Sequence, residues 1–107
     1  MDRVFHALAD ATRRDILRQA IEGEHSVSAL ARRYPVSLPA VQKHVGVLEE
    51  AGLVSKERRG REQLVRSNVD AIRQAAQLLD QFEAVWRGRI DRIGEILAED
   101  DHGGATA

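Results

Sequence analysis

Residues 26–54 constrain the fold most strongly, because their apolar pattern is interrupted by a proline. The apolar residues of the first part follow the i, i+3, i+4, i+7 spacing of one helical face: Val27, Leu30, Ala31 and Tyr34. Pro35 cannot donate a backbone hydrogen bond, and it disfavours helical geometry at the residue before it. The sequence therefore predicts a short helix that stops at Pro35, followed by a tight turn.

A second helix is expected to begin after Ser37, whose hydroxyl can accept a hydrogen bond from an amide of the first turn. Pro39 fits this first turn, and Gly52 suits the C-terminal cap. The inward stripe of this helix is apolar and consists of Val41, Val45 and Leu48. Two short helices around a tight turn are typical of the helix-turn-helix, whose second helix reads the major groove of DNA.

The outward face of the second helix carries small or hydrogen-bonding side chains, which suit a groove about 12 Å wide. Gln42 can bind adenine through two hydrogen bonds, and Lys43 can donate to guanine or to a phosphate. Leu38 and Pro39 can contact thymine methyl groups, and Ser37 can help to set the register on the phosphates. His44, beside the inward stripe, can offer a proton to a phosphate. On this stretch alone, an ordinary amphipathic hairpin in a small helical domain stays open as an alternative.

Two strand candidates follow, residues 53–58 and 63–67, around a turn centred on Gly60. The hairpin is rich in arginine, and Arg58, Arg59 and Arg61 can reach phosphates or the adjacent minor groove. A basic hairpin beside a reading helix would be a wing. The alternative is a hairpin that is charged only for solubility and to protect its edges.

Residues 28–65, SALARRYPVSLPAVQKHVGVLEEAGLVSKERRGREQLV, resemble the winged helix of the ArsR/SmtB family of bacterial repressors. Residues 8–17, LADATRRDIL, are similar to the opening helix of that family, "LADxTRRxIL". The resemblance covers residues 4 to 67 or so. It implies a mainly α fold with a small β-hairpin wing, and a homodimeric transcriptional repressor that binds a palindromic operator and is often released by a ligand.

The N-terminal third is expected to supply scaffold. Thr12 and Asp15 have the spacing of a capping box, which predicts a helix that starts at Thr12 and ends near Gly23. Arg13 and Arg14 could touch DNA, although a solvated helix face is the preferred interpretation of both.

A long helix is expected over residues 70–99, which contain no proline. Its apolar residues recur at spacings of three and four and form a seam that includes Leu79, Phe82, Trp86, Ile90, Ile93 and Leu97. A helix about 45 Å long would overhang so small a domain. The sequence thus predicts a two-fold dimer that pairs this helix with its mate and with an N-terminal apolar face of Val4, Phe5 and Leu8. The alternative is that the seam packs only within its own subunit.

Charge is divided along the chain although the net charge is only −1. Residues 32–66 hold eight basic and four acidic side chains, a net charge of +4, and residues 67–107 hold four basic and eight acidic ones, a net charge of −4. Positive charge therefore lies where the motif expects DNA. Residues 1–99 are expected to form one winged helix-turn-helix and dimerisation domain, with residues 100–107 a disordered acidic and glycine-containing tail.

Several classes of protein are disfavoured by the composition. The chain contains no cysteine, which excludes a disulfide framework and a thiolate metal site. It contains neither a nucleophile elbow nor a phosphate-binding glycine loop, so we do not expect an enzyme. With no apolar run of membrane-spanning length and no signal peptide, a cytoplasmic protein without membrane contact is expected.

Metal sensing is also disfavoured, because the family's two common metal sites are missing. The cysteine pair before the reading helix is absent, and the last helix lacks the Asp-x-His and His-x-x-Glu motifs. His6 and Asp10 would supply only half of a site. We therefore expect no metal and no cofactor.

Three functions stay open. The first is a dimeric repressor that binds a double-stranded operator. The second is a winged helix that binds protein, which would need an exposed apolar patch where Pro39, Gln42 and Lys43 stand. The third is a repressor that responds to a small-molecule inducer of unknown identity between the long helices, and it adds to the first.

Overall fold

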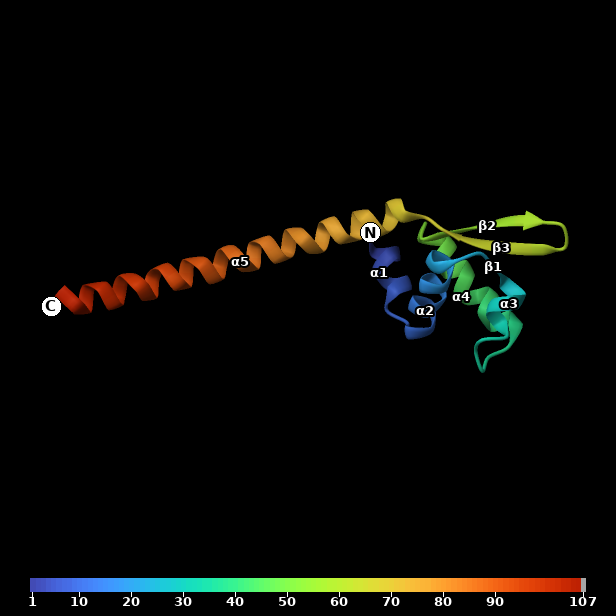
Figure 1. Cartoon of the computed structure of the whole chain (residues 1–107), viewed down its shortest axis with the longest axis horizontal. Coiled ribbons are helices and arrows are strands. Elements are labelled where there is room, and N and C mark those ends of the chain that lie inside the picture. The colour runs from blue at the N-terminus through green and yellow to red at the C-terminus, as the bar shows by residue number, and fades with distance from the viewer. Residues whose placement is uncertain (107) are drawn as a thin grey trace. The chain divides into compact units, whose positions relative to one another are not determined.

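The computed structural model describes the backbone of residues 1–106 and the side chains of residues 1–99. The elements in order are α1 (Asp2–Leu8), α2 (Ala11–Glu22), β1 (His25–Ser26), α3 (Val27–Ala31), α4 (Leu38–Glu50), β2 (Val54–Arg59), β3 (Glu62–Ser67) and α5 (Val69–Thr106) (Figure 1). The chain divides into two units, residues 1–75 and residues 76–107. The first unit confirms the prediction of a mainly helical winged helix-turn-helix.

Helix α2 begins earlier than the sequence indicated. Its N-cap is Asp10, whose carboxylate accepts a hydrogen bond from the Arg13 amide at 2.9 Å. The prediction that Thr12 caps this helix is therefore wrong, because the extended backbone of Asp10 places a better acceptor beside the free amides. The helix ends at Gly23 as predicted.

The helix-turn-helix consists of α3 and α4, and each begins at a serine cap. The Ser26 hydroxyl accepts from the Ala29 amide at 3.1 Å, and the Ser37 hydroxyl accepts from the Ala40 amide at 3.3 Å. Helix α3 ends at Ala31, earlier than expected, and Tyr34 lies in the turn. The Tyr34 hydroxyl donates to the Asp15 carboxylate of α2 at 2.6 Å, and this hydrogen bond connects the turn to α2.

The end of α4 turns the chain into the wing through Gly52, which has φ +76°. The Gly52 amide donates to the Glu49 carbonyl and the Leu53 amide to the Leu48 carbonyl, both at 3.0 Å. This pair of bonds is a Schellman motif, and it requires a residue that tolerates the left-handed region. Leu48 and Leu53 are both fully buried beneath it.

The wing is a three-stranded antiparallel sheet in the order β1-β3-β2. Strands β2 and β3 are in register from Val54 opposite Ser67 to Arg59 opposite Glu62, which leaves Gly60 and Arg61 as a two-residue turn. Gly60 has φ +63°, whereas Arg61, like every other non-glycine residue that the structure describes, does not have a positive φ, and this sign pattern is that of a type II′ turn. Strand β1, which pairs with residues 64 and 65 of β3, was not predicted.

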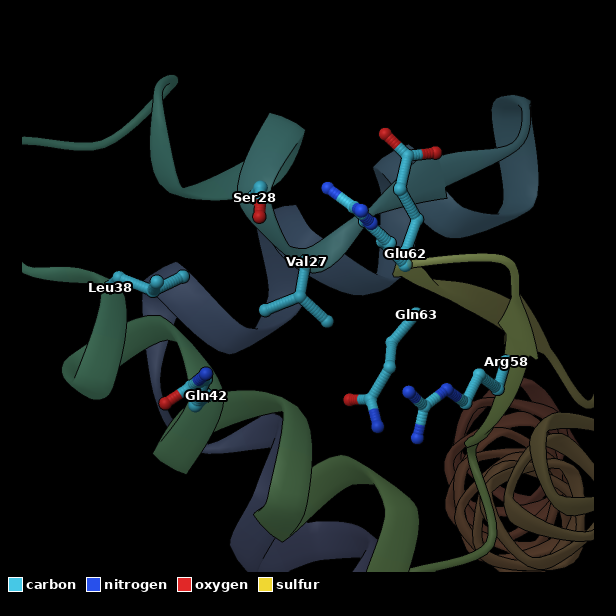
Figure 2. A pocket seen from close by; sticks show the side chains of 8 residues that line it. Val27, Ser28, Leu38, Gln42, Arg58, Glu62 and Gln63 are labelled. Carbon is cyan, nitrogen blue, oxygen red and sulfur yellow. The ribbon is translucent and has the colours of Figure 1, made fainter.

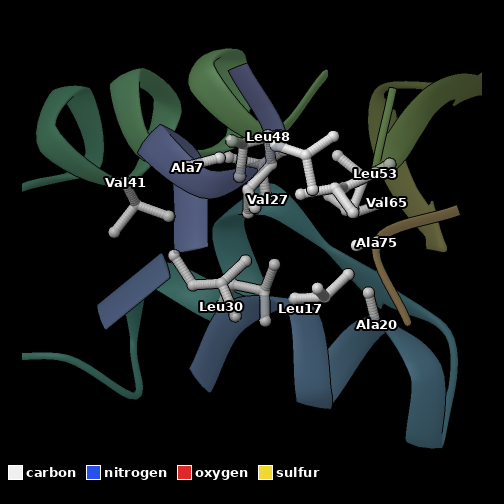
Figure 3. Close-up of a cluster of buried hydrophobic side chains, with 14 residues drawn as sticks. Ala7, Leu17, Ala20, Val27, Leu30, Val41, Leu48, Leu53, Val65 and Ala75 are labelled. Atoms are coloured by element: carbon white, nitrogen blue, oxygen red, sulfur yellow. The ribbon is translucent and has the colours of Figure 1, made fainter. Parts of the chain in front are cut away.

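The hydrophobic core joins these elements except β1 (Figure 3). The predicted inward stripe of α4 is fully buried, and it packs with residues from the other helices and the sheet. The buried cluster consists of Val4, Ala7, Ile16, Leu17, Ala20, Val27, Leu30, Val41, Val45, Leu48, Leu53, Val54, Val65 and Ala75.

Helix α5 begins at Val69, and its first turns contribute Ala71, Ile72 and Ala75 to the core of the first unit. The second unit continues the same helix past Glu99, where the sequence placed its end. The side chains of residues 100–107 lie outside the described residues, so the disordered tail stays a prediction. Within the part of the chain that the structure describes, no helix is both long and apolar enough to cross a membrane.

Candidate nucleic-acid interface

The outward face of α4 is open in this structure. Leu38, Pro39, Gln42 and Lys43 are all exposed, and Gly46 is half-buried. Ser37 is exposed at the start of the helix, and its hydroxyl accepts the capping hydrogen bond while its own O–H can still donate. The face therefore offers one amide, one ammonium group, one hydroxyl donor and two apolar side chains to a ligand.

The two faces of the wing differ in what they can offer. Because side chains alternate along a strand, Arg58 and its cross-strand partner Gln63 share one face, whereas Arg59 lies on the other. Lys56 belongs to the Arg58 face, and its ammonium group lies 3.6 Å from the Glu49 carboxylate of α4. The Arg58 face is therefore the one that looks toward the reading helix.

On the opposite face, Glu24 binds two arginines. Its carboxylate lies 3.5 Å from a guanidinium nitrogen of Arg59 and 3.0 Å from one of Arg66. Arg66 also pairs with Glu57. These four side chains form an ion-pair cluster that connects the wing to the segment after α2.

Between α4 and the wing lies a hollow of about 350 Å³ (Figure 2). In Figure 2 the Arg58 and Gln63 side chains lie next to each other and extend from the wing toward the side where Gln42 lies. The residues that line the hollow are Val27, Ser28, Leu38, Gln42, Arg58, Arg61, Glu62 and Gln63. The structure thus brings the predicted Leu38, Gln42, Arg58 and Arg61 together in one place.

Sequence reasoning missed Ser28 and Gln63 as members of this surface. Gln63 could have been found, since the register of a two-residue hairpin makes it the partner of Arg58. Ser28 carries no such signal, because its place depends on how α3 packs against β3.

The basic side chains of this region are not equally available. Arg59, Arg66 and Lys56 are paired with carboxylates, whereas Lys43, Arg58 and Arg61 have no carboxylate within 4 Å among the described side chains. Among the described residues, the one hydrogen-bond partner of the Arg58 side chain is the Gly60 carbonyl, at 3.4 Å. Arg58 and Arg61 therefore bring unneutralised positive charge to the wing side of the hollow, and Lys43 adds one charge on the exposed face of α4 outside its lining.

Arg13 and Arg14 have a role that the sequence did not predict. The Arg13 guanidinium donates to the Ala7 carbonyl at 2.8 Å and to the His6 carbonyl at 3.1 Å, and Arg14 donates to the Leu8 carbonyl at 2.8 Å. The interpretation as a solvated helix face is wrong for Arg13, which is half-buried, whereas Arg14 is exposed as expected. Both side chains donate to carbonyls at the end of α1, where the helix itself supplies too few donors. A third Arg13 nitrogen, Nη1, lies 3.4 Å from Nδ1 of His44, which is half-buried on α4.

Comparison with known proteins gives the same interpretation of these elements. A family model described as a helix-turn-helix domain matches residues 8–57. The chain is 38% identical over 96 residues to the HTH-type transcriptional regulator Rv2034 of Mycobacterium tuberculosis, covering 90% of this chain and 87% of that protein. A crystal structure of an ArsR-like transcriptional regulator from Rhodococcus sp. RHA1 superimposes with a TM-score of 0.77 at 37% identity, covering 89% of this chain and 90% of the other.

This chain belongs to the ArsR family. It is therefore a DNA-binding transcriptional regulator and not an enzyme. A further match is the solution structure of the homodimeric winged helix-turn-helix DNA-binding domain, fragment 1–100, of Mb0332 from Mycobacterium bovis, described as a possible ArsR-family transcriptional regulator. It has 30% identity and a TM-score of 0.63, and the alignment covers 77% of each chain.

Two further features of the structure concern possible metal ligands and the predicted dimer surface. Among the described residues, no group of three or more His, Asp or Glu side chains is placed to hold a metal ion. Of the predicted dimer residues, Val4 belongs to the core and is only 6% exposed, while Phe5 and Leu8 are half-buried. The predicted α5 residues Leu79, Phe82, Trp86, Ile90, Ile93 and Leu97 are 47 to 62% exposed in the single chain.

Proposed function

We propose that this ArsR-family regulator is a homodimeric repressor that reads a near-palindromic operator with α4 and holds the flanking backbone with the Arg58 face of its wing. The observation that carries the proposal is the hollow between α4 and the wing, which Gln42 lines from one side and Arg58 and Arg61 line from the other. Polar readers and unpaired arginines in one concave surface suit a nucleic acid.

The roles of the α4 residues follow from their chemistry and exposure. Gln42 and Lys43 would read base edges, while Leu38 and Pro39 would contact thymine methyl groups. Ser37 would cap the start of α4 and also help to set the register on a phosphate, since its hydroxyl accepts from the Ala40 amide and can still donate its own O–H. With only Leu38 and Pro39 as apolar groups on this face, the surface suits DNA better than the apolar groove of a protein-binding module.

In the wing, Arg58 and Arg61 would contact phosphates, because they line the hollow and have no carboxylate partner among the described side chains. Arg59, which the sequence grouped with them, lies on the other face and is held by Glu24. Its contribution would be smaller, since DNA would have to replace that ion pair. Arg59 is therefore a natural control for the other two.

The dimer would form on the exposed apolar side of α5. Leu79, Phe82, Val85 and Trp86 are each followed eleven residues later by another apolar residue, namely Ile90, Ile93, Ile96 and Leu97. A period of eleven over three turns keeps one stripe continuous along a nearly straight helix. All eight side chains are exposed in the single chain, and burying them in a second copy would stabilise the assembly. The homodimeric state of the Mb0332 domain supports the proposal of a dimer.

A two-fold dimer would place its two reading helices in successive major grooves, about 34 Å apart, which accounts for a near-palindromic site. Repression is what the ArsR resemblance implies. A non-metal inducer bound between the two α5 helices would act on the same assembly, and Trp86 on the apolar stripe would report it by fluorescence.

The test is binding to a labelled DNA fragment from upstream of the protein's own coding region, with scrambled DNA as competitor and a series of salt concentrations. Gln42→Ala should weaken specific binding by about 1 to 3 kcal/mol while leaving binding to scrambled DNA unchanged. Lys43→Ala should weaken specific binding by a similar amount and binding to scrambled DNA by less, because it also removes one positive charge. Arg58→Ala combined with Arg61→Ala should weaken binding to all sequences and lower the salt slope of the dimer by about 3.6, because each protomer loses two phosphate contacts.

Arg59→Ala is the matched control and should change the salt slope less than either of the other arginines. Equal loss of affinity on every sequence in the α4 and the wing variants would contradict the division into readers and anchors. If the wild-type protein shows no preference over scrambled DNA, a random-sequence selection decides between an operator elsewhere and a protein-binding surface.

A further inference from the structure

The Arg13 side chain lies where three helices meet. It belongs to the first turn of α2, and its guanidinium donates to two carbonyls at the end of α1, those of His6 and Ala7. Its remaining terminal nitrogen faces Nδ1 of His44 on α4, at 3.4 Å. One side chain thus connects α1 and α2 to the proposed reading helix.

The chemistry of the two groups determines the direction of the last contact. A guanidinium has five N–H donors and no acceptor, so Nδ1 of His44 must be the acceptor. A neutral imidazole that accepts at Nδ1 carries its proton on Nε2. The contact with Arg13 therefore selects one tautomer of His44 and leaves its Nε2–H as the free donor.

We propose that Arg13 is a positioning residue for DNA binding, which fixes His44 as the Nε2–H tautomer so that His44 donates this proton to a phosphate of the DNA backbone. His44 directly follows Lys43 on α4 and is only half-buried, so its ring can reach the edge of the surface that faces DNA. This inference rests on the proposed function, because it assumes that α4 lies in the groove.

The same contact gives a physical connection between the proposed dimer surface and the DNA surface. Helix α1 carries Phe5 and Leu8, which are half-buried and partly available to a second copy. A shift of α1 would move the carbonyls that hold Arg13, and Arg13 would carry that shift to His44. The Asp10 carboxylate, bound to the Arg13 amide, is the acidic group beside this cluster and holds the start of α2 in place.

The first experiment uses the free protein and needs no DNA. Long-range ¹H–¹⁵N NMR spectra of the imidazole nitrogens report the tautomer of each of the four histidines. In the wild-type protein, His44 should show an unprotonated Nδ1 and a protonated Nε2. In Arg13→Met, which keeps the aliphatic stem and removes the donors, His44 should show a mixture of tautomers, whereas His6, His25 and His102 should be unchanged.

Arg14→Met is the control, because it removes a single donor to the end of α1 and leaves His44 alone. A protonated Nδ1 on His44 in the wild-type protein would overturn the proposal. So would identical His44 signals in the wild-type protein and Arg13→Met. Circular dichroism verifies that both variants are folded.

The second experiment measures operator binding by two variants that each imitate one ring nitrogen. A glutamine amide reaches the position of Nε2, and an asparagine amide reaches only that of Nδ1. His44→Gln should bind within about threefold of the wild-type protein, and His44→Asn should lose about tenfold or more, as expected for one hydrogen bond to a charged acceptor.

Equal affinity of His44→Gln and His44→Asn would overturn the phosphate contact. The two proposals fail in different ways. If α4 does not read DNA, Gln42→Ala and Lys43→Ala lose no specificity, whereas the tautomer of His44 in the free protein still tests the role of Arg13.

Discussion

Gly46, inside α4, and Gly52, just after its end, should respond in opposite ways to substitution by alanine. Gly46 lies inside the helix, where glycine is less stable than alanine by about 0.5 to 1 kcal/mol. Gly52 follows the helix in the left-handed region, with φ +76°, where a Cβ costs about 1 to 2 kcal/mol. An added Cβ would meet no atom within 4 Å at either position, so the backbone term alone decides the sign.

We therefore expect Gly46→Ala to raise the free energy of unfolding by about 0.5 to 1 kcal/mol, and Gly52→Ala to lower it by about 1 to 2 kcal/mol. Urea denaturation followed by circular dichroism measures both changes. The variants must be compared at equal protein concentration, because dissociation of a dimer contributes to apparent stability.

Gly46→Ala should also weaken operator binding despite its greater stability. Gly46 lies on the same side of α4 as Gln42 and Lys43, and a methyl group there would meet DNA that approaches closely. A more stable variant with weaker binding shows that the glycine is kept for the interface. Loss of stability in Gly46→Ala, no change in Gly52→Ala, or unchanged DNA binding by Gly46→Ala would each refute one step of this reasoning.

Two further predictions concern the dimer and the packing of the turn. Phe82→Asp should convert the dimer to monomers in sedimentation velocity, because it puts a charge in the apolar stripe. Asp80→Ala, which lies off the stripe, is the control and should leave the dimer intact. A dimer in both variants would exclude the stripe as the dimer surface. In Tyr34→Phe, the loss of the hydrogen bond to Asp15 should raise the pKa of that carboxyl toward its usual 3.8, because this bond is the main cause of its lowered pKa, ahead of the bond from Arg18. Because the pKa of Asp15 is lowered in the fold, its carboxylate stabilises the fold above pH 3.8, and this stabilisation is lost as the pH falls. The wild-type protein should therefore lose more stability than Tyr34→Phe during acid titration. Parallel curves of stability against pH for the two proteins would contradict the role of this bond.

Local signals in the sequence were sufficient for the helix-turn-helix and the boundaries of α4, whereas α3 ends earlier than predicted. The serine cap at Ser37, the buried stripe of α4 and the terminal Gly52 were all predicted and are confirmed. The hairpin around Gly60 was predicted in the same way. These features depend on residues within three or four positions of one another, so the chain itself contains what is needed to predict them.

The tertiary structure decided which side chains meet. Strand β1 has two residues and no pattern of its own, and it exists because β3 lies beside it. Whether a wing arginine is free or paired depends on Glu24, which is 35 residues away from Arg59 along the chain. The contact between Arg13 and His44 likewise spans 31 residues. Such contacts form only when packing of the core brings distant segments together, and no local pattern records which atoms then face each other.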